Sequence, residues 1–491
     1  MTDILLGKGG HQVYLLAKYA NRHGLVAGAT GTGKTVSLLV IAEGLSRIGV
    51  PVFIADVKGD VAGLSMPGAA TPQVETRARE VGLASYAPEA APVVFWDLYG
   101  KAGHPIRTTV SEIGPALFAR MLELNDVQAG VLDITFRLAD EQGLLLLDLD
   151  DLRSLLNLVS EKHAEVSQRY GLVSTQSIAA IQRALLRLEG DGKQFFGEPA
   201  LELTDLLRTD LTGRGIVSIL AADRLVLQPR LYSTFLLWLL SELFERLPEV
   251  GDLDKPKLAF IFDEAHLLFD DAPPALMQRI EQVVRLIRSK GVGIYFCSQF
   301  PDDVPGEILG QLGNRVQHAL RAFTPRDQKA VKTAAETFVP NPNINVAQAI
   351  SQLGVGEALV STLQDKGVPM PVERALMAPP RCRMGTITSD ERAAVIARSP
   401  IGGKYDTAIN RESASEILTR RRSEAAPTEK PAAKGAKEAP QGDMLHDWLW
   451  GTGRRQGMVE SMAKQAARTV GSQLGRQILR GVLGGITSRR K

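Results

Sequence analysis

The chain has 491 residues, 44% hydrophobic and 23% charged, with a net charge of +2, so it can bury a large core and its overall charge favours no class of partner. Its two cysteines, Cys297 and Cys382, are too few for a disulfide framework or a zinc-cysteine site. The N-terminus carries no signal-like segment, and the most apolar stretch, residues 235–240, is far shorter than the about 20 residues that cross a bilayer, so we expect a cytoplasmic protein.

Short apolar runs alternate with helical patterns over most of the chain. Such runs indicate strands buried on both faces of a mainly parallel sheet, which is an α/β fold. We expect a helix over residues 34–47, directly after the first run. The predicted strands are residues 23–27, 51–56, 93–97, 215–220, 258–262 and 292–297.

A helical stretch interrupts this alternation. Ile178, Ile181, Leu185 and Leu188 recur at three- and four-residue spacing, which is typical of an amphipathic helix. We therefore divide the α/β core into residues 1–110 and 211–400, with a helical insertion over residues 111–210.

The composition changes near residue 419. Residues 420–442 are rich in Ala, Pro, Lys and Glu without periodicity, which predicts a disordered linker. Residues 446–491 then form a basic tail with nine Lys and Arg against two acids, a net charge of +7. Apolar residues recur in it every four positions, as expected for an amphipathic helix. This stripe comprises Met458, Met462, Ala466, Val470, Leu474, Ile478 and Val482.

The first predicted strand is followed by a phosphate-binding signature. Residues 28–35 match G-x-x-x-x-G-K-[ST], in which glycines let backbone N–H groups surround phosphate oxygens at a helix N-terminus. Lys34 is expected to reach the β- and γ-phosphates, and the Thr35 hydroxyl to bind Mg²⁺. The segment ends at Thr35, and position 36 is excluded from it. The whole loop is the predicted nucleotide-binding segment: Gly28, Ala29, Thr30, Gly31, Thr32, Gly33, Lys34 and Thr35.

Two carboxylates follow the predicted strand at residues 258–262. A strand that ends in Asp263 and Glu264 places both at the carboxyl edge of the sheet, where ligands bind in open α/β folds. We expect Asp263 to hold Mg²⁺ through water and Glu264 to orient and deprotonate the attacking water. The chain is thus predicted to bind ATP with Mg²⁺ and to hydrolyse it.

Three further polar groups follow predicted strands. Gln299 ends the strand at 292–297 and is expected to reach the γ-phosphate or the attacking water. The turn of residues 56–60, Asp-Val-Lys-Gly-Asp, suits contact with nucleotide or a neighbouring subunit, and an ordinary β-to-α turn explains it equally well. His266 completes a DEAH tetrapeptide, and we interpret it chiefly as a helix-start residue.

Together, the 28–35 loop, the 56–60 turn, the 258–264 strand and Gln299 resemble the HerA/FtsK superfamily of P-loop ATPases, and closest in pattern are the uncharacterised bacterial HerA-like ATPases. The resemblance covers roughly residues 5–400. It implies a RecA-like core that assembles as a homo-hexamer, with ATP between subunits and an arginine from the neighbour completing the site. The candidates for that arginine are Arg288, Arg315 and Arg321, the last two flanking an apolar run that suits a strand at the subunit edge.

The resemblance favours an ATP-driven motor that moves DNA through a ring, a translocase or helicase. The alternatives are a motor of the same fold that acts on protein or at a membrane, and a slow regulatory NTPase, against which Glu264 argues. The chain shows no DNA-reading module, so DNA as a partner rests on the resemblance.

The basic tail leaves three interpretations open. It could lie on an anionic membrane surface, bind the phosphates of DNA, or pack its apolar stripe on the ring with its bases solvated.

Overall fold

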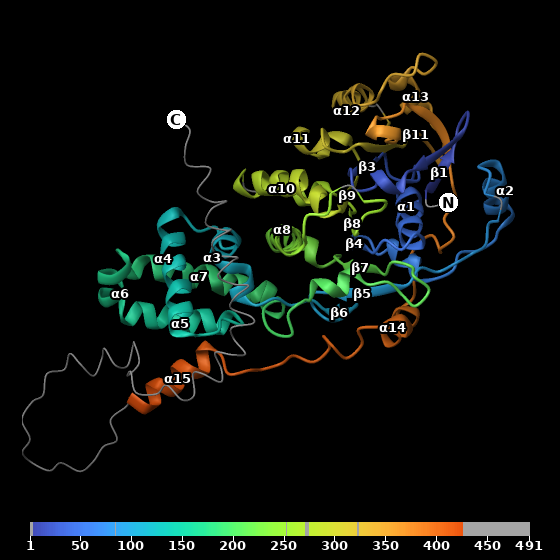
Figure 1. Ribbon diagram of the computed structural model, residues 1–491. Coiled ribbons are helices and arrows are strands. Elements are labelled where there is room, and N and C mark those ends of the chain that lie inside the picture. The colour runs from blue at the N-terminus through green and yellow to red at the C-terminus, as the bar shows by residue number, and fades with distance from the viewer. Residues whose placement is uncertain (1–2, 84, 252, 271–273, 322–323, 426–491) are drawn as a thin grey trace, which may run out of the picture.

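The computed structural model describes residues 3–425, apart from residues 84, 252, 271–273 and 322–323. One twelve-stranded sheet forms the centre of the molecule (Figure 1), in the order β2-β1-β12-β11-β10-β3-β9-β8-β4-β7-β5-β6. Its strands are β1 (Ile4–Lys8), β2 (Gln12–Leu15), β3 (Gly24–Ala27), β4 (Val52–Asp56), β5 (Val93–Asp97), β6 (His104–Pro105), β7 (Val217–Ala221), β8 (Leu258–Phe262), β9 (Val292–Ser298), β10 (Asn314–Gln317), β11 (Glu357–Ser361) and β12 (Glu373–Met377).

The six predicted strands are all present and lie together. β3, β9, β8, β4, β7 and β5 are consecutive neighbours, and every pair among them is parallel. Every residue of β4 and β8 is buried. The near-continuous apolar runs are explained by this burial, because helices cover both faces of the sheet at these strands. The α/β fold class is confirmed.

The other side of the sheet is mostly antiparallel. β10 pairs in parallel with β3, but β11, β12, β1 and β2 then follow in antiparallel order. The strand expected at the subunit edge near residues 316–320 is β10, and it lies inside the sheet, between β3 and β11. β10 is therefore not an edge strand of this sheet, because β11 pairs with it and has four of its five residues buried.

Two sets of helices cover the sheet. On one face, α1 (Lys34–Arg47) and α14 (Ser389–Ala397) share a buried apolar cluster with alternate residues of the strands. On the opposite face lie α8 (Pro229–Arg246) and α10 (Pro274–Ile287). The remaining helices of the core are α2 (Pro72–Glu80), α9 (His266–Phe269), α11 (Gly306–Leu309), α12 (Pro325–Glu336) and α13 (Val346–Gln352).

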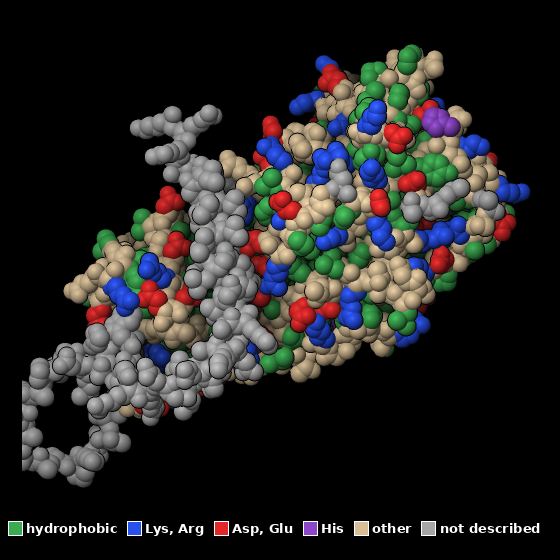
Figure 2. Space-filling model, in the orientation of Figure 1, with side chains coloured by type: hydrophobic (Ala, Val, Ile, Leu, Met, Phe, Trp, Pro, Cys, Tyr) green, Lys and Arg blue, Asp and Glu red, His purple; other side chains and the backbone are tan. Residues whose placement is uncertain are grey.

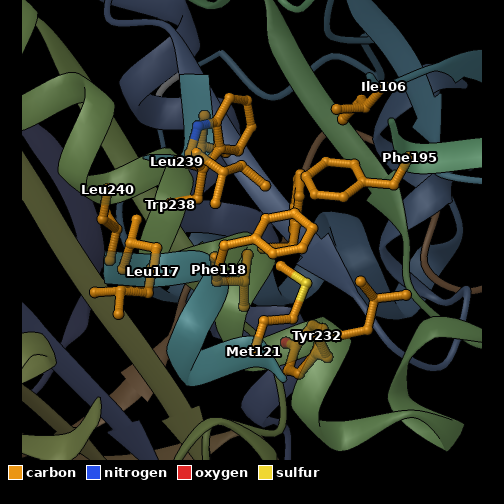
Figure 3. Close-up of a cluster of buried hydrophobic side chains, with 14 of the residues drawn as sticks. Ile106, Leu117, Phe118, Met121, Phe195, Tyr232, Trp238, Leu239 and Leu240 are labelled. Atoms are coloured by element: carbon orange, nitrogen blue, oxygen red, sulfur yellow. The ribbon is translucent and has the colours of Figure 1, made fainter. Parts of the chain in front are cut away.

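The segment between β6 and β7 folds as the predicted helical insertion, at one side of the sheet (Figure 1). It joins the core through α8, whose residues 235–240 are all buried, because this helix lies between the sheet and the insertion. Figure 3 shows side chains of α3 and α8 meeting Phe195 in this joint. The insertion contains α3 (Val110–Met121), α4 (Asp126–Gln142), α5 (Leu149–Glu161), α6 (His163–Tyr170) and α7 (Thr175–Gly192).

The last described helix, α15 (Ala414–Ala425), packs against α5 of the insertion. It corrects the start of the predicted linker, since residues 420–425 are helical. Arg421 donates to Gln142 Oε1 at 3.1 Å, and Arg422 pairs with Glu161, so contacts with the insertion hold these polar residues in a helix. The rest of the linker and the whole basic tail lie outside the described residues.

Basic and acidic side chains are interleaved over the face shown in Figure 2, in keeping with the small net charge. In the described part of the chain, no helix is both long enough and apolar enough to span a bilayer.

Candidate functional site

The predicted phosphate-binding loop connects β3 to α1. Gly28, Gly31 and Gly33 have φ angles of +152°, +78° and +116°, a region that favours glycine. A Cβ at Gly28 would also lie 2.5 Å from the Cβ of His318. The loop therefore requires glycine both for its backbone conformation and for its close packing, and Gly33 is the N-cap from which α1 presents its unpaired N–H groups.

Polar side chains of the loop turn inward. Lys34 is buried, and its Nζ donates to the Ala29 carbonyl at 3.2 Å, as does the Thr32 hydroxyl at 2.7 Å. The Thr35 hydroxyl donates to Asp60 Oδ2 at 3.2 Å. The amine and the hydroxyl that the sequence assigned to phosphate and to Mg²⁺ thus lie at one place, with Asp60 next to the hydroxyl.

Position 36, which the prediction leaves out of the nucleotide-binding segment, lies in the first turn of α1. It carries Val36 and not a second threonine after Thr35, so assigning a threonine to position 36 would be wrong. The half-buried side chain of Val36 is aliphatic and has no oxygen to offer to phosphate or to Mg²⁺. Thr35 is therefore the residue with a hydroxyl at this end of the loop.

His318 supports the loop from the end of β10, a role that the sequence did not reveal. Its Nδ1 donates to the Glu357 carbonyl at 3.0 Å, so its Nε2, 2.9 Å from Ser37 Oγ, is the acceptor of that hydroxyl. Burial lowers the pKa of His318 to about 4 and keeps the ring neutral. The histidine thereby links α1, β10 and β11 behind the loop, and only the fold brings these distant residues together.

Three carboxylates meet beside the loop: Asp56, Asp60 and Asp263 each offer an oxygen within 4.8 Å of the other two. Asp56 ends β4 and Asp263 follows β8, and these two strands are parallel neighbours with Ala55 opposite Phe262. Burial and the neighbouring negative charges raise the pKa of Asp56 to about 7 and that of Asp263 to about 6.

This cluster fits a magnesium ion. Hard oxygen ligands gather next to the Thr35 hydroxyl, and the Asp60 Oδ1 atom is buried without a hydrogen-bond partner in the described structure. A divalent cation would compensate the repulsion that raises the two pKa values. The sequence predicts Thr35 and Asp263 as ligands, and the structure places Asp56 and Asp60 beside them.

Glu264 lies next to this cluster in a strained conformation. Its φ is +48°, uncommon for a residue with a side chain, and its carboxylate is buried. Lys58 forms an ion pair with its Oε1 atom, and His266 Nδ1 lies 3.4 Å from its Oε2 atom. The turn of residues 56–60 therefore contacts Glu264 through Lys58, a contact that the sequence did not predict.

Gln299 directly follows β9, the strand between β3 and β8. Ser298 is paired with Ala27 in the sheet, and its carbonyl accepts from the Gly28 N–H at 3.3 Å. Gln299 thus begins beside the phosphate loop and is half-buried there. The fold brings Lys34, Thr35, Asp263, Glu264 and Gln299 to one edge of the sheet.

The three candidate arginines have different surroundings. Arg315 is half-buried and donates to the carbonyls of Leu309, Leu312 and Thr337, and burial lowers its pKa. Arg288 precedes β9 and so lies at the opposite edge of the sheet from the phosphate loop. Arg321 is exposed beyond β10, on the same edge as the loop.

Known proteins resemble this chain in sequence and in fold. The model of the family "Helicase HerA-like C-terminal" matches residues 2–491. A "Probable helicase MJECL08" of Methanocaldococcus jannaschii is 32% identical over 120 residues, which are 24% of this chain and 21% of that protein. The chain thus matches about a fifth of that relative's length.

Two solved structures are similar in arrangement. The bacterial conjugative coupling protein TrwBdeltaN70, in its unbound monoclinic form, has a TM-score of 0.49 at 16% identity, over 78% of this chain and 92% of that one. VirB4 of Thermoanaerobacter pseudethanolicus has a TM-score of 0.48 at 16% identity, over 79% of this chain and 97% of that one. The family match, which extends over nearly every residue, shows that this chain belongs to the Helicase HerA-like C-terminal family of P-loop ATPases.

Proposed function

We propose that this protein is an ATP-hydrolysing ring motor that moves DNA, as a translocase or helicase. The observation that carries the proposal is the convergence of the glycine loop, Lys34, the carboxylate cluster, Glu264 and Gln299 at one sheet edge. The family assignment and the name of the archaeal relative, a probable helicase, support DNA as the substrate.

Different residues of the chain carry out the separate steps of ATP hydrolysis. The loop N–H groups and Lys34 bind the phosphates, and Glu264 accepts the proton of the attacking water, which Gln299 orients. Thr35 and Asp263, with Asp56 and Asp60 beside them, would hold Mg²⁺, which when bound neutralises charge on the phosphates. Burial of Lys34 and Glu264 strengthens their interactions with a charged ligand.

We propose further that the active form is a homo-hexamer, with an arginine acting in trans. Two of the candidate arginines lie in or next to β10. The side chain of Arg321 is exposed and can therefore reach a neighbouring subunit. The guanidinium of Arg315 instead donates hydrogen bonds to three backbone carbonyls. Replacing Arg315 would therefore also disturb the fold, so Arg321 is the cleaner test.

The test of assembly mixes two inactive variants, Glu264→Gln and Arg321→Ala. If the arginine acts in trans, mixed rings contain some complete sites and regain part of the activity. A particle that stays monomeric in light scattering with ATP, at full ATPase rate, would contradict the hexamer.

The test of the substrate measures the ATPase rate with and without double-stranded DNA at a fixed salt concentration. We expect DNA to stimulate hydrolysis in the wild type, and Glu264→Gln to hydrolyse slowly in both conditions. A rate that is indifferent to DNA would favour the alternative, a motor of the same fold that acts on protein or at a membrane surface.

A further inference from the structure

Lys58 joins the proposed catalytic base to the turn between β4 and Asp60. Its Nζ forms an ion pair with Oε1 of Glu264. The lysine side chain is 47% exposed, whereas that of Glu264 is 5% exposed. A cation that is reachable from outside the molecule is therefore bound to a carboxylate that is not.

The turn that carries Lys58 is attached to the nucleotide site at both ends. Asp56 Oδ1 accepts from the Gly59 N–H at 2.8 Å, which closes the turn, and Gly59 has a φ of +78°. Asp60 Oδ2 accepts from the Thr35 hydroxyl at 3.2 Å. The position of Lys58 is thus coupled to the two carboxylates that flank the proposed magnesium site.

The ion pair limits what Glu264 can do. A general base must accept a proton from water, and an ammonium group that is hydrogen-bonded to Oε1 occupies a lone pair of that oxygen. The other oxygen, Oε2, is buried and accepts no hydrogen bond from the described residues, although His266 Nδ1 lies 3.4 Å away. Glu264 is therefore held in place by its contact with Lys58, and its Oε1 atom is engaged.

On the basis of the hydrolytic role proposed above for Glu264, we propose that Lys58 is a positioning residue that restrains this base, so that fast hydrolysis requires Lys58 to leave Oε1. The restraint keeps basal ATP consumption low. Exposure of Lys58 allows its release by a change at the surface, without any opening of the buried site.

The decisive variant is Lys58→Met in the full-length protein. Loss of one charge-assisted hydrogen bond to the base should raise basal kcat about tenfold. The KM for ATP and the Kd for a non-hydrolysable ATP analogue with Mg²⁺ should stay within about twofold, because the phosphate contacts are unchanged. Lys58→Arg should restore the low basal rate, since a guanidinium also pairs with a carboxylate.

Two controls make the result specific. Lys8→Met removes an exposed lysine on β1, near the opposite end of the sheet, and should leave kcat unchanged. Lys58→Gln removes the charge but keeps a polar side chain, and should behave as Lys58→Met does if the ion pair is what matters. Thermal unfolding of each variant establishes that it is folded.

The outcomes separate this proposal from the one on which it rests. If Lys58→Met and Lys58→Gln fold but have a wild-type or lower kcat, the restraint is refuted, while a slow Glu264→Gln variant still supports Glu264 as the base. If Glu264→Gln hydrolyses ATP at the wild-type rate, the assignment of the base itself fails. A fast Lys58→Met variant that Glu264→Gln silences in the double variant would support both proposals.

Discussion

The carboxyl edge of the sheet and the joint between the sheet and the insertion are both buried, but the edge buries charged side chains and the joint buries apolar ones. At the edge, Asp56, Asp263 and Glu264 are buried side by side. In the joint, aromatic and aliphatic side chains pack on one another, among them Phe195 and Trp238, with ring centroids 5.7 Å apart (Figure 3). Burying like charges costs free energy, whereas burying apolar area stabilises the fold. The comparison indicates that the joint stabilises a fold whose site is arranged for chemistry.

The largest effect is expected from substitutions at the carboxyl edge of the sheet, which should strongly slow ATP hydrolysis and leave the fold intact. Glu264→Gln should bind ATP with near wild-type affinity and hydrolyse it roughly 10²- to 10⁴-fold more slowly, because an amide cannot accept the proton of water. Lys34→Ala is the contrasting variant: it should lose nucleotide binding as well, since the phosphates lose their cationic contact. Binding of a fluorescent ATP analogue and a steady-state ATPase assay check both. Wild-type turnover by Glu264→Gln would show that another group is the base.

The second largest effect is a loss of stability caused by a substitution in the joint between the sheet and the insertion. Phe195 is 1% exposed and its ring contacts those of Phe196, Phe235 and Trp238. Phe195→Ala should destabilise the protein by about 3–5 kcal/mol through lost contacts and a cavity. Urea unfolding followed by circular dichroism measures this change. Leu172→Ala, at a side chain that is 85% exposed, should change stability by less than about 0.5 kcal/mol, and equal effects of the two variants would refute the contrast.

The third effect tests the cost of the buried acids. Because burial and neighbouring charges raise the pKa of Asp56 to about 7, the folded state holds a proton there that the unfolded state releases near pH 4. Stability should therefore fall as the pH rises from about 4 to about 7. Asp56→Asn keeps an acceptor for the Gly59 N–H and should be more stable than the wild type at pH 7–8 by about 1–4 kcal/mol.

Urea unfolding without Mg²⁺, at pH values from 4 to 8, compares the two proteins. Identical pH dependence in the wild type and Asp56→Asn would show that the carboxyl does not retain its proton. Addition of Mg²⁺ should stabilise the wild type more than Asp56→Asn at pH 8, because the ion compensates the negative charge that the variant lacks.

The smallest effect concerns the basic tail, which is assigned from sequence alone. Truncation after Gln441 removes residues 442–491, which include the basic tail and carry nine Lys and Arg against three acids. If the tail binds DNA, truncation should weaken DNA binding and flatten its salt dependence. If it binds a membrane, only the full-length protein should sediment with anionic vesicles. If its apolar stripe packs on the ring, both assays should be unchanged and the hexamer should be less stable.

Sequence reasoning succeeded where local pattern and three-dimensional role coincide. The apolar run of β8 indicates a buried strand, and Asp263 and Glu264 directly after it indicate a polar site at the end of the strand, so both signals lie within seven residues. The antiparallel strands β11 and β12 were not predicted, since each has only three consecutive apolar residues and its place is set by pairing with strands distant in the chain.

The missing parts of the site depend on contacts between residues distant in the chain. His318 and Ser37 are 281 positions apart in the sequence, and Lys58 and Glu264 are 206 positions apart. No local motif can therefore predict either contact. Arg315 is a third example, because the sequence makes it a candidate for the arginine that acts in trans, whereas in the fold its guanidinium donates to three backbone carbonyls. Residue types and spacing identify which groups can react, but the fold determines which neighbours hold them.

The packing of α15 on α5 has a consequence for the order in which the protein folds during synthesis. Ser413 Oγ donates to Asp151 Oδ1 at 2.5 Å, and Ser154 and Ser415 are hydrogen-bonded, so the insertion is completed by residues made more than 250 positions later. Contacts of such long range close slowly. On the ribosome, one face of α5 therefore stays uncovered until almost the entire ATPase core has been translated. During this period the exposed face of α5 is a surface that a chaperone can bind.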